Sequence, residues 1–449
     1  MRKIIALLGI MLLTASSVTA ESINKTLAKL GVNKSAVSVL IKDAQSGSVV
    51  YSLNEKMPMT PASTLKLITT SAAVDTLGLD YKYLTTLYKS TNNDLYLKLS
   101  GDPLLTSSDL DKLVSAAAAK EIAPKTFYVD DSAFDKSEWG EGWQWDDELN
   151  PLMPKFSVYN INNNLLKIEV APTVNKAPAK LAVKPFYPVT FMNLVTTDFS
   201  STTALNIEKN NAVAPNMLDI TGSVAKLSYM TLPVLNPKIN FMLRLEDSIR
   251  SAKLDYFAPV KTAKLPSDKV YKVEEIEHEI EPILPLIFKN SNNLMAETIF
   301  KTAGSVWSKS QGATSNSLAM LDNYFNKLNL NSEDIKVVDG SGVSKNNLMT
   351  AEFMVDFLRV KAAEDDFETF KTGLPTPGEG TLKNRMLYFK DNLYAKTGTL
   401  ADTSSIAGYL TSRRGKLYVF DIMINDAKTS PADKKNIEEQ ILRNVYVNY

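Results

Sequence analysis

The sequence contains no cysteine and only one histidine among its 449 residues. The lack of cysteine excludes disulfides, thiol nucleophiles and thiolate metal sites, so the fold must be stabilised by packing. A single histidine cannot build a multi-histidine metal centre, and a Ser-His-Asp triad would have to use this one residue, His278. His278 stands among glutamates in a stretch that is typical of a solvated surface. We therefore expect neither a metal nor a cofactor.

An excess of charge and a membrane-spanning apolar run are also missing. Lys and Arg together number 50, as do Asp and Glu, which gives no indication of a nucleic-acid partner. The apolar run Ile4–Leu13 follows two basic residues and leads to the small residues Val18-Thr19-Ala20. This pattern predicts a cleavable secretory signal over residues 1–20, and no later stretch is long enough for a transmembrane anchor.

The two ends of the chain carry alternating patterns that predict β-hairpins. One pairs Ala36–Lys42 with Ser48–Leu53, and the other pairs Ser405–Leu410 with Leu417–Ile424;. A last helix is expected after the N-cap Ser430. Hairpins from the two ends commonly form one antiparallel sheet, which the helical middle of the chain would cover. We predict an α+β catalytic domain closed by both termini.

Short β-like runs broken by Pro, Asn, Thr and Ser fill the region between about Thr85 and Glu275. This texture predicts an insertion of one or two mostly β domains. Trp139, Trp143 and Trp145 cluster within it. We favour a role for these tryptophans in core or interdomain packing over contact with a sugar or peptide.

The segment Thr60–Gly78 has a proline suited to a helix start and ends in a glycine suited to a helix stop;. Ser63 and Lys66 lie three residues apart near its beginning, so the hydroxyl and the amine can meet on one face of the helix. The lysine can act as a base only when neutral, and its apolar neighbours favour the burial that this requires. The spacing predicts a nucleophile and its base, although Ser-x-x-Lys also occurs at Ser223 and Lys226.

Two further polar groups complete the pattern. Ser291 and Asn293 stand two apart just before a helical stretch, where the hydroxyl can relay a proton and the carboxamide can bind a substrate amide;. Lys396-Thr397-Gly398-Thr399 enters the C-terminal hairpin, where a cation, a hydroxyl and a glycine suit a peptide with a free carboxylate. We reject the rival Lys371-Thr372-Gly373 because the prolines that follow it would break a strand.

The order Ser-x-x-Lys, Ser-x-Asn, Lys-Thr-Gly resembles the trio of the β-lactamases and penicillin-binding proteins. More narrowly, the chain resembles the class C low-molecular-mass penicillin-binding proteins, a D-alanyl-D-alanine carboxypeptidase and endopeptidase family. The gap of 228 residues between Ser63 and Ser291 matches the domain insertion of that family. Further matching motifs are Ser100-Gly101-Asp102-Pro103, Ser291-Asn292-Asn293-Leu294-Met295-Ala296-Glu297, Asp339-Gly340-Ser341-Gly342-Val343-Ser344 and Gly378-Glu379-Gly380-Thr381-Leu382.

This resemblance implies that Ser63 forms an acyl-enzyme with the carbonyl between two D-alanines, while Lys66 takes its proton. It also implies that the backbone amides of Ser63 and Thr399 hold the oxyanion, and that Ser291 helps to protonate the leaving amine. The remaining implied roles are binding of the substrate backbone by Asn293 and of the carboxylate by Lys396 and Thr397. A positive charge at Lys396 would help to keep Lys66 neutral.

The resemblance also implies the location, the partners and the domain boundaries. We expect a periplasmic protein that acts on peptidoglycan peptides ending in D-Ala-D-Ala and is acylated by β-lactam antibiotics. The predicted boundaries are 1–20 for the signal, 21–84 and 276–449 for the catalytic domain, 85–106 and 165–275 for one inserted domain, and 107–164 for another. The alternatives are a serine β-lactamase or esterase, which would release its penicilloyl adduct quickly, and a noncatalytic peptidoglycan-binding protein.

Overall fold

Both ends of the chain meet in one five-stranded antiparallel sheet. The computed structural model describes residues 23–210 and 217–449, so the predicted signal over residues 1–20 lies outside the described residues. The strands follow the order β14-β15-β16-β1-β2. Their bounds are β1 Val37–Asp43, β2 Val49–Leu53, β14 Leu393–Thr399, β15 Thr403–Thr411 and β16 Leu417–Asn425. Because β1 pairs with β16, the predicted sheet that joins the two terminal hairpins is confirmed.

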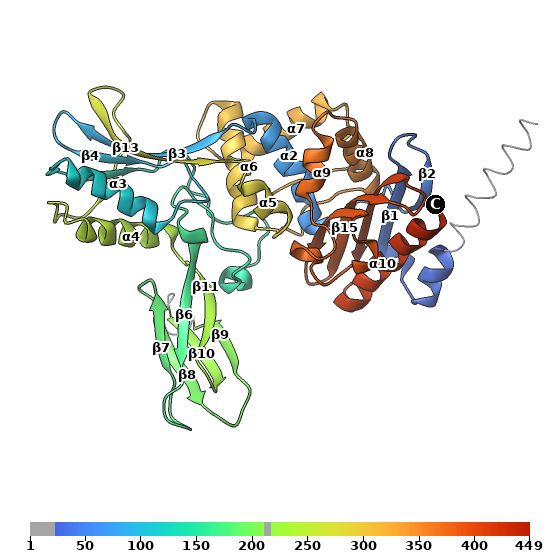
Figure 1. The fold of residues 1–449 in the computed structure, drawn as a ribbon, viewed down its shortest axis with the longest axis horizontal. Helices are drawn as coiled ribbons and strands as arrows, with labels where there is room; N and C mark the ends of the chain where they lie inside the picture. The colour runs from blue at the N-terminus through green and yellow to red at the C-terminus, as the bar shows by residue number, and fades with distance from the viewer. Residues whose placement is uncertain (1–22, 211–216) are drawn as a thin grey trace, which may run out of the picture.

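The two faces of this sheet are covered by different helices. On one face lies α10 (Pro431–Asn448), which Ser430 caps by accepting the N–H of Asp433. The predicted apolar side of α10 is buried against the strands. On the other face, α8 packs against β1 and β16 and a layer of helices continues behind it (Figure 1). The helices of this layer are α2 Lys66–Leu77, α5 Ile283–Phe288, α6 Asn293–Ser308, α7 Thr314–Lys327, α8 Ala351–Ala362 and α9 Phe367–Gly373.

Helix α2 lies at the centre of this layer, with neighbours on most of its sides. It contacts α5, α6 and α7, and its residues from Lys66 to Ala73 are all buried. A helix surrounded in this way needs small and apolar residues all round rather than one apolar stripe. That explains the run Leu-Ile-Thr-Thr-Ser-Ala-Ala-Val that follows Lys66, and the helix stops at Gly78, as predicted.

The inserted region forms two further parts (Figure 1). The first is a five-stranded sheet, in the order β12-β5-β4-β3-β13, packed against two helices. Its elements are β3 Lys82–Ser90, β4 Leu95–Lys98, β5 Phe127–Asp130, β12 Lys261–Thr262, β13 Val270–Glu279, α3 Ser107–Ala119 and α4 Pro237–Ser251. The second is a pair of three-stranded sheets, in the orders β8-β10-β9 and β11-β6-β7. Its strands are β6 Leu165–Ala171, β7 Lys180–Lys184, β8 Thr190–Thr197, β9 Ala204–Lys209, β10 Met217–Val224 and β11 Ser228–Pro233.

Strand pairing within the insert does not follow the boundaries predicted from the sequence. β5 falls in the predicted segment 107–164, yet it pairs with β4, which falls in 85–106. β3 and β13 each cross a predicted edge of the catalytic domain and pair with one another. The reason is that strands remote in sequence complete a sheet by hydrogen bonding, which composition along the chain does not reveal.

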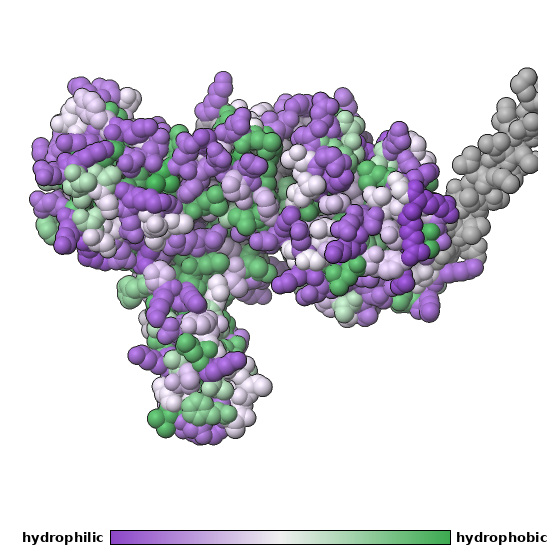
Figure 2. Space-filling model, viewed as in Figure 1, coloured by the Kyte–Doolittle hydropathy of each residue, from purple (hydrophilic) through white to green (hydrophobic). Residues whose placement is uncertain are grey.

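The double-sheet part projects from the rest of the molecule and exposes several large apolar side chains (Figure 2). They are Val174, Phe186, Leu194, Phe199, Leu227 and Tyr229. Within the described residues, no helix combines the length and the apolar character that crossing a membrane requires.

Candidate active site

Ser63 sits at the entrance to α2, where the backbone is tightly wound. It belongs to a short 3-10 helix, η2 (Ala62–Leu65), which leads directly into α2. The preceding residue, Ala62, has φ 50°, a left-handed conformation that is uncommon for a residue with a Cβ. Such strain persists only where the surroundings enforce it, and it is frequent at functional sites. The strained turn leaves Ser63 partly exposed while Lys66 is fully buried.

The predicted contact between Ser63 and Lys66 is present. Lys66 Nζ lies 2.8 Å from Ser63 Oγ, 2.6 Å from Asn293 Oδ1 and 2.5 Å from the carbonyl oxygen of Ser341. Burial lowers the pKa of Lys66 from 10.5 to about 7, although the negative charges of Asp339 and Glu297 oppose the shift. Near neutral pH, a large fraction of Lys66 is therefore unprotonated and able to accept a proton from Ser63.

The Ser-x-Asn segment reaches Lys66 from the start of α6. Ser291 adopts φ 57°, and Asn293 is the first residue of the helix. The carboxamide of Asn293 spans two partners, because its oxygen faces Lys66 and its nitrogen donates to the carbonyl oxygen of Leu152, 2.8 Å away. The latter contact brings a segment of the insert to the edge of the site.

Lys396 is also fully buried. Its Nζ lies 2.9 Å from Ser291 Oγ and 2.8 Å from the carbonyl oxygen of Thr397. Burial is the main cause of a Lys396 pKa well below its ordinary value, and the nearby charge of Lys66 is the second cause. The resemblance implied that the charge of Lys396 helps to keep Lys66 neutral. Lys396 is not among the causes of the lowered Lys66 pKa, and the leading cause is burial. Ser63 with Lys66 and Ser291 with Lys396 thus form two hydrogen-bonded pairs, close enough for the charge of one lysine to act on the other.

Gly398 has a packing role that the sequence did not reveal. A Cβ at this position would lie 2.2 Å from Ser405 Oγ and 2.8 Å from the carbonyl oxygen of Pro61. Both atoms are buried, and Ser405 Oγ donates a hydrogen bond of 2.5 Å to the carbonyl oxygen of Pro61. Glycine thus lets β14 lie directly against η2 and its Ser63. Next to Gly398, the Thr397 hydroxyl forms a hydrogen bond of 2.7 Å with the Thr381 hydroxyl. Thr399, at the end of β14, is exposed.

Two buried carboxylates, to which the sequence assigned no role, support the site. Glu297 accepts the backbone N–H groups of Gly340 and Ser341 at 3.0 and 2.8 Å, and burial raises its pKa. Asp339 accepts from the N–H groups of Gly342 and Ser344 at 2.8 and 2.7 Å. Together they hold the loop whose Ser341 carbonyl contacts Lys66. The only signal in the sequence is that both residues lie in the motifs that carry the family resemblance.

The same loop packs against the turn that contains Ser63. A Cβ at Gly342 would lie 2.0 Å from the carbonyl oxygen of Ala62. This close approach explains how Ala62 is kept in its strained conformation.

The three tryptophans divide between packing and exposure. Trp143 is buried and donates from Nε1 to Asp339 at 2.9 Å. Trp139 packs edge-on against Trp143, with ring centroids 5.0 Å apart. Packing is therefore confirmed for these two, whereas Trp145 is 79% exposed.

His278 differs from the solvated residue that the sequence indicated. Its Nδ1 lies 2.6 Å from Asp102 Oδ2, its Nε2 lies 3.8 Å from Asp109, and its side chain is only 25% exposed. The surrounding glutamates do face solvent on β13, but the ring turns toward α3 and the segment after β4. The hydrogen bond to Asp102 is the largest cause of a raised His278 pKa.

The rival motifs do not reproduce the site. Ser223 lies within strand β10, and Lys226 is exposed in the bend that follows the strand. Lys371-Thr372-Gly373 closes helix α9, where Thr372 donates to the carbonyl oxygen of Glu368 at 2.8 Å. Its rejection as a strand motif is confirmed.

Comparison with known proteins agrees with this geometry. The model of the D-Ala-D-Ala carboxypeptidase 3 (S13) family matches residues 19–445. The chain is 27% identical to a D-alanyl-D-alanine carboxypeptidase of Actinomadura sp. (strain R39), covering 95% of this chain and 86% of the relative. It is 22% identical to one of Haemophilus influenzae, covering 92% and 90%. The crystal structure of penicillin binding protein 4 from Haemophilus influenzae has the same fold, with a TM-score of 0.79 and 22% identity over 92% of this chain and 96% of that one.

Proposed function

Since this chain belongs to the D-Ala-D-Ala carboxypeptidase 3 (S13) family, we propose that Ser63 is the nucleophile through which it cleaves D-alanyl-D-alanine peptides. The family makes the protein a serine-type D-Ala-D-Ala peptidase, a hydrolase. The observation that carries the assignment to Ser63 is the 2.8 Å contact between its hydroxyl and a buried lysine whose pKa is about 7. A neutral amine at this distance can take the proton as the hydroxyl attacks.

The neighbouring groups suit the other steps of acyl transfer. Ser291 Oγ stands beside Lys396, from which a proton can pass toward the departing amine. The carboxamide of Asn293 lies where a substrate backbone would run, and Thr397 with Lys396 suits the terminal carboxylate. Backbone N–H groups of Ser63 and Thr399 would stabilise the oxyanion, and water would then release the acyl group.

The substrate that fits is a peptidoglycan stem peptide ending in D-Ala-D-Ala. β-Lactams would acylate Ser63 in the same way, and the Haemophilus penicillin binding protein 4, which shares this fold, has been described in complex with a β-lactam. Both carboxypeptidase and endopeptidase cleavage follow from the same chemistry, because only the group attached to the departing amine differs. Action on peptidoglycan would place the protein in the periplasm, in keeping with the signal predicted over residues 1–20.

The test is the intact mass of the purified chain from residue 21 after brief exposure to benzylpenicillin, beside Ser63→Ala. We expect one stable adduct on the wild type, none on the variant, and release of D-alanine from a D-Ala-D-Ala peptide by the wild type alone. Turnover of the antibiotic without an adduct would indicate a β-lactamase instead. A Ser63→Ala variant that still releases D-alanine at the normal rate would exclude this nucleophile.

A further inference from the structure

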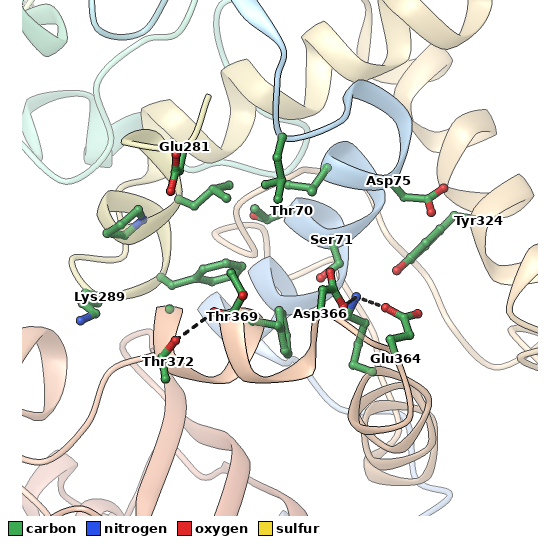
Figure 3. Close-up of a pocket in the computed structure, with 18 residues that line it drawn as sticks. Thr70, Ser71, Asp75, Glu281, Lys289, Tyr324, Glu364, Asp366, Thr369 and Thr372 are labelled. Atoms are coloured by element: carbon green, nitrogen blue, oxygen red, sulfur yellow. Dashed lines mark hydrogen bonds and ion pairs between the residues drawn. The ribbon is translucent and has the colours of Figure 1, made fainter. Parts of the chain in front are cut away.

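A cavity of about 440 Å³ lies beside helix α2, which carries Lys66 (Figure 3). Its walls are the later turns of α2, helix α5, Tyr324 of α7, the end of α8 and helix α9. None of the residues proposed for catalysis lines it, so it is separate from the acyl-transfer site. Its volume lies within the range that accommodates small-molecule ligands.

One end of the cavity is apolar. It is lined by Leu284, Pro285 and Phe288 of α5 and by Phe370 of α9. The rings of Phe288 and Phe370 meet edge to face, with centroids 6.0 Å apart. These side chains form an apolar surface that can bind the hydrophobic part of a ligand.

The opposite end is acidic. Figure 3 shows Asp75, Tyr324, Glu364 and Asp366 grouped on one side of the cavity, away from Lys289. Lys361 is the cation among them, and it pairs with Glu364 and lies 3.5 Å from Asp366. The three carboxylates raise the pKa of Tyr324, after burial as the larger cause.

The negative charge of the lining is not balanced by its ion-pair partners. The lining carries the carboxylates of Asp75, Glu281, Glu364 and Asp366 and the ammonium groups of Lys289 and Lys361. Two ion-pair partners lie outside the lining: Lys327 pairs with Asp75, and Glu379 pairs with Lys289. The positive charge of Lys327 and the negative charge of Glu379 cancel, so these partners do not change the net charge. An excess of carboxylate remains, which favours a cationic ligand over an anionic one.

A buried polar group in the same wall has no partner. Thr70 lines the cavity and is 1% exposed, and its Oγ1 makes no hydrogen bond to the residues that the structure describes. A buried hydroxyl without a partner is costly and therefore uncommon. A ligand in the cavity would supply the missing hydrogen bond.

We propose that this cavity binds a small amphipathic amine, with its apolar body against the Phe288 and Phe370 rings and its ammonium group among Asp75, Glu364 and Asp366. The site goes beyond the peptidase activity and does not depend on the role of Ser63. The ligand would touch α2 one turn beyond Lys66, at Thr70, and so contact the helix that carries the proposed base.

The test is calorimetric titration of the purified chain at neutral pH with 4-phenylbutylamine, and with 4-phenylbutan-1-ol as the uncharged analogue. We expect saturable one-to-one binding of the amine, with affinity at least about tenfold above that of the alcohol. Comparable binding of the two, or no binding of the amine, would overturn the proposal.

Four variants locate the binding. Asp75→Asn with Asp366→Asn should weaken binding of the amine by at least about tenfold, and Val74→Phe, which fills the cavity, should abolish binding. Glu333→Gln, an exposed carboxylate elsewhere, should bind as the wild type does. Thr70→Val should lose about threefold to tenfold in affinity without a lower melting temperature, because its hydroxyl has no partner in the folded protein. Unchanged affinity in the Asp75 and Asp366 double variant would place the amine elsewhere and defeat the proposal.

Discussion

Trp143 and Asp339 are 196 residues apart in the chain and are joined by a buried hydrogen bond of 2.9 Å. The tryptophan belongs to the inserted region, whereas the aspartate begins the loop whose Ser341 carbonyl contacts Lys66. The insert thus helps to hold the loop that faces the proposed base. Through this bond, the insert supports the candidate active site.

Loss of the Trp143 indole N–H should destabilise the protein. Trp143→Phe keeps the aromatic packing with Trp139 but removes one of the donors to a buried carboxylate. Hydrogen bonds to charged groups contribute about 1.5–3 kcal/mol, so we expect the free energy of unfolding to fall by about this amount in urea titrations. Trp145→Phe is the matched control, and its 79% exposed side chain should leave the value nearly unchanged; equal losses in both variants would contradict the role of the buried bond.

The rate of acylation should depend on pH through Lys66. Its folded pKa of about 7 lies below the ordinary 10.5, so the amine becomes neutral, and thus able to act as a base, as the pH rises through 7. We expect the second-order rate constant for acylation by benzylpenicillin to rise across this interval and to be half-maximal near pH 7. A rate that is flat between about pH 5.5 and 8.5 would argue against a lysine base.

Removal of the proposed base, Lys66, should slow acylation without preventing penicillin from entering the site. General-base catalysis contributes about 10²–10⁴-fold, and we expect Lys66→Ala to lower the acylation rate constant by such a factor. Lys226→Ala tests the second Ser-x-x-Lys pair, whose lysine is exposed in a bend, and should acylate at the wild-type rate. If the two variants lost activity equally, the assignment of Lys66 would fail.

A methyl group at position 398 should disrupt the contact of β14 with the turn that contains Ser63. In Gly398→Ala the new Cβ would lie 2.2 Å from Ser405 Oγ, and overpacking of this kind costs about 1–3 kcal/mol. We expect lower stability and a loss of acylation greater than the loss of stability explains. Gly373→Ala is the control, because its nearest neighbour would be 4.0 Å away; a Gly398→Ala variant of normal stability and rate would show that β14 adjusts freely.

His278 should make the stability depend on pH. Its pKa is raised above 6.5 in the folded protein, chiefly by the hydrogen bond to Asp102. The stabilisation is therefore complete below the unfolded pKa and is lost as the pH rises through the higher folded value. Unfolding free energies measured across this window should decline for the wild type and stay flatter for His278→Gln. Identical pH profiles would show that the pair does not couple folding to protonation.

Local features could be predicted because neighbouring residues determine them. The meeting of Ser63 and Lys66 follows from a spacing of three residues in a helical turn, and the cap at Ser430 and the stop at Gly78 follow from the preferences of helix ends. The terminal hairpins follow from alternation and turn residues. The family motifs supplied the candidates Ser291, Asn293 and Lys396, and the structure brings these together with the first pair.

Other features depend on which distant segments come into contact. Nothing near Gly398 indicates that Pro61 will lie against it, and nothing near His278 indicates Asp102. The pairing of β5 with β4, the bond from Trp143 to Asp339 and the cavity behind α2 likewise involve segments that are separated along the chain. The sequence determined the local conformations and the chemical groups available to the site. The tertiary structure alone decided which groups are buried together, and burial is what brings the pKa of Lys66 close to neutrality.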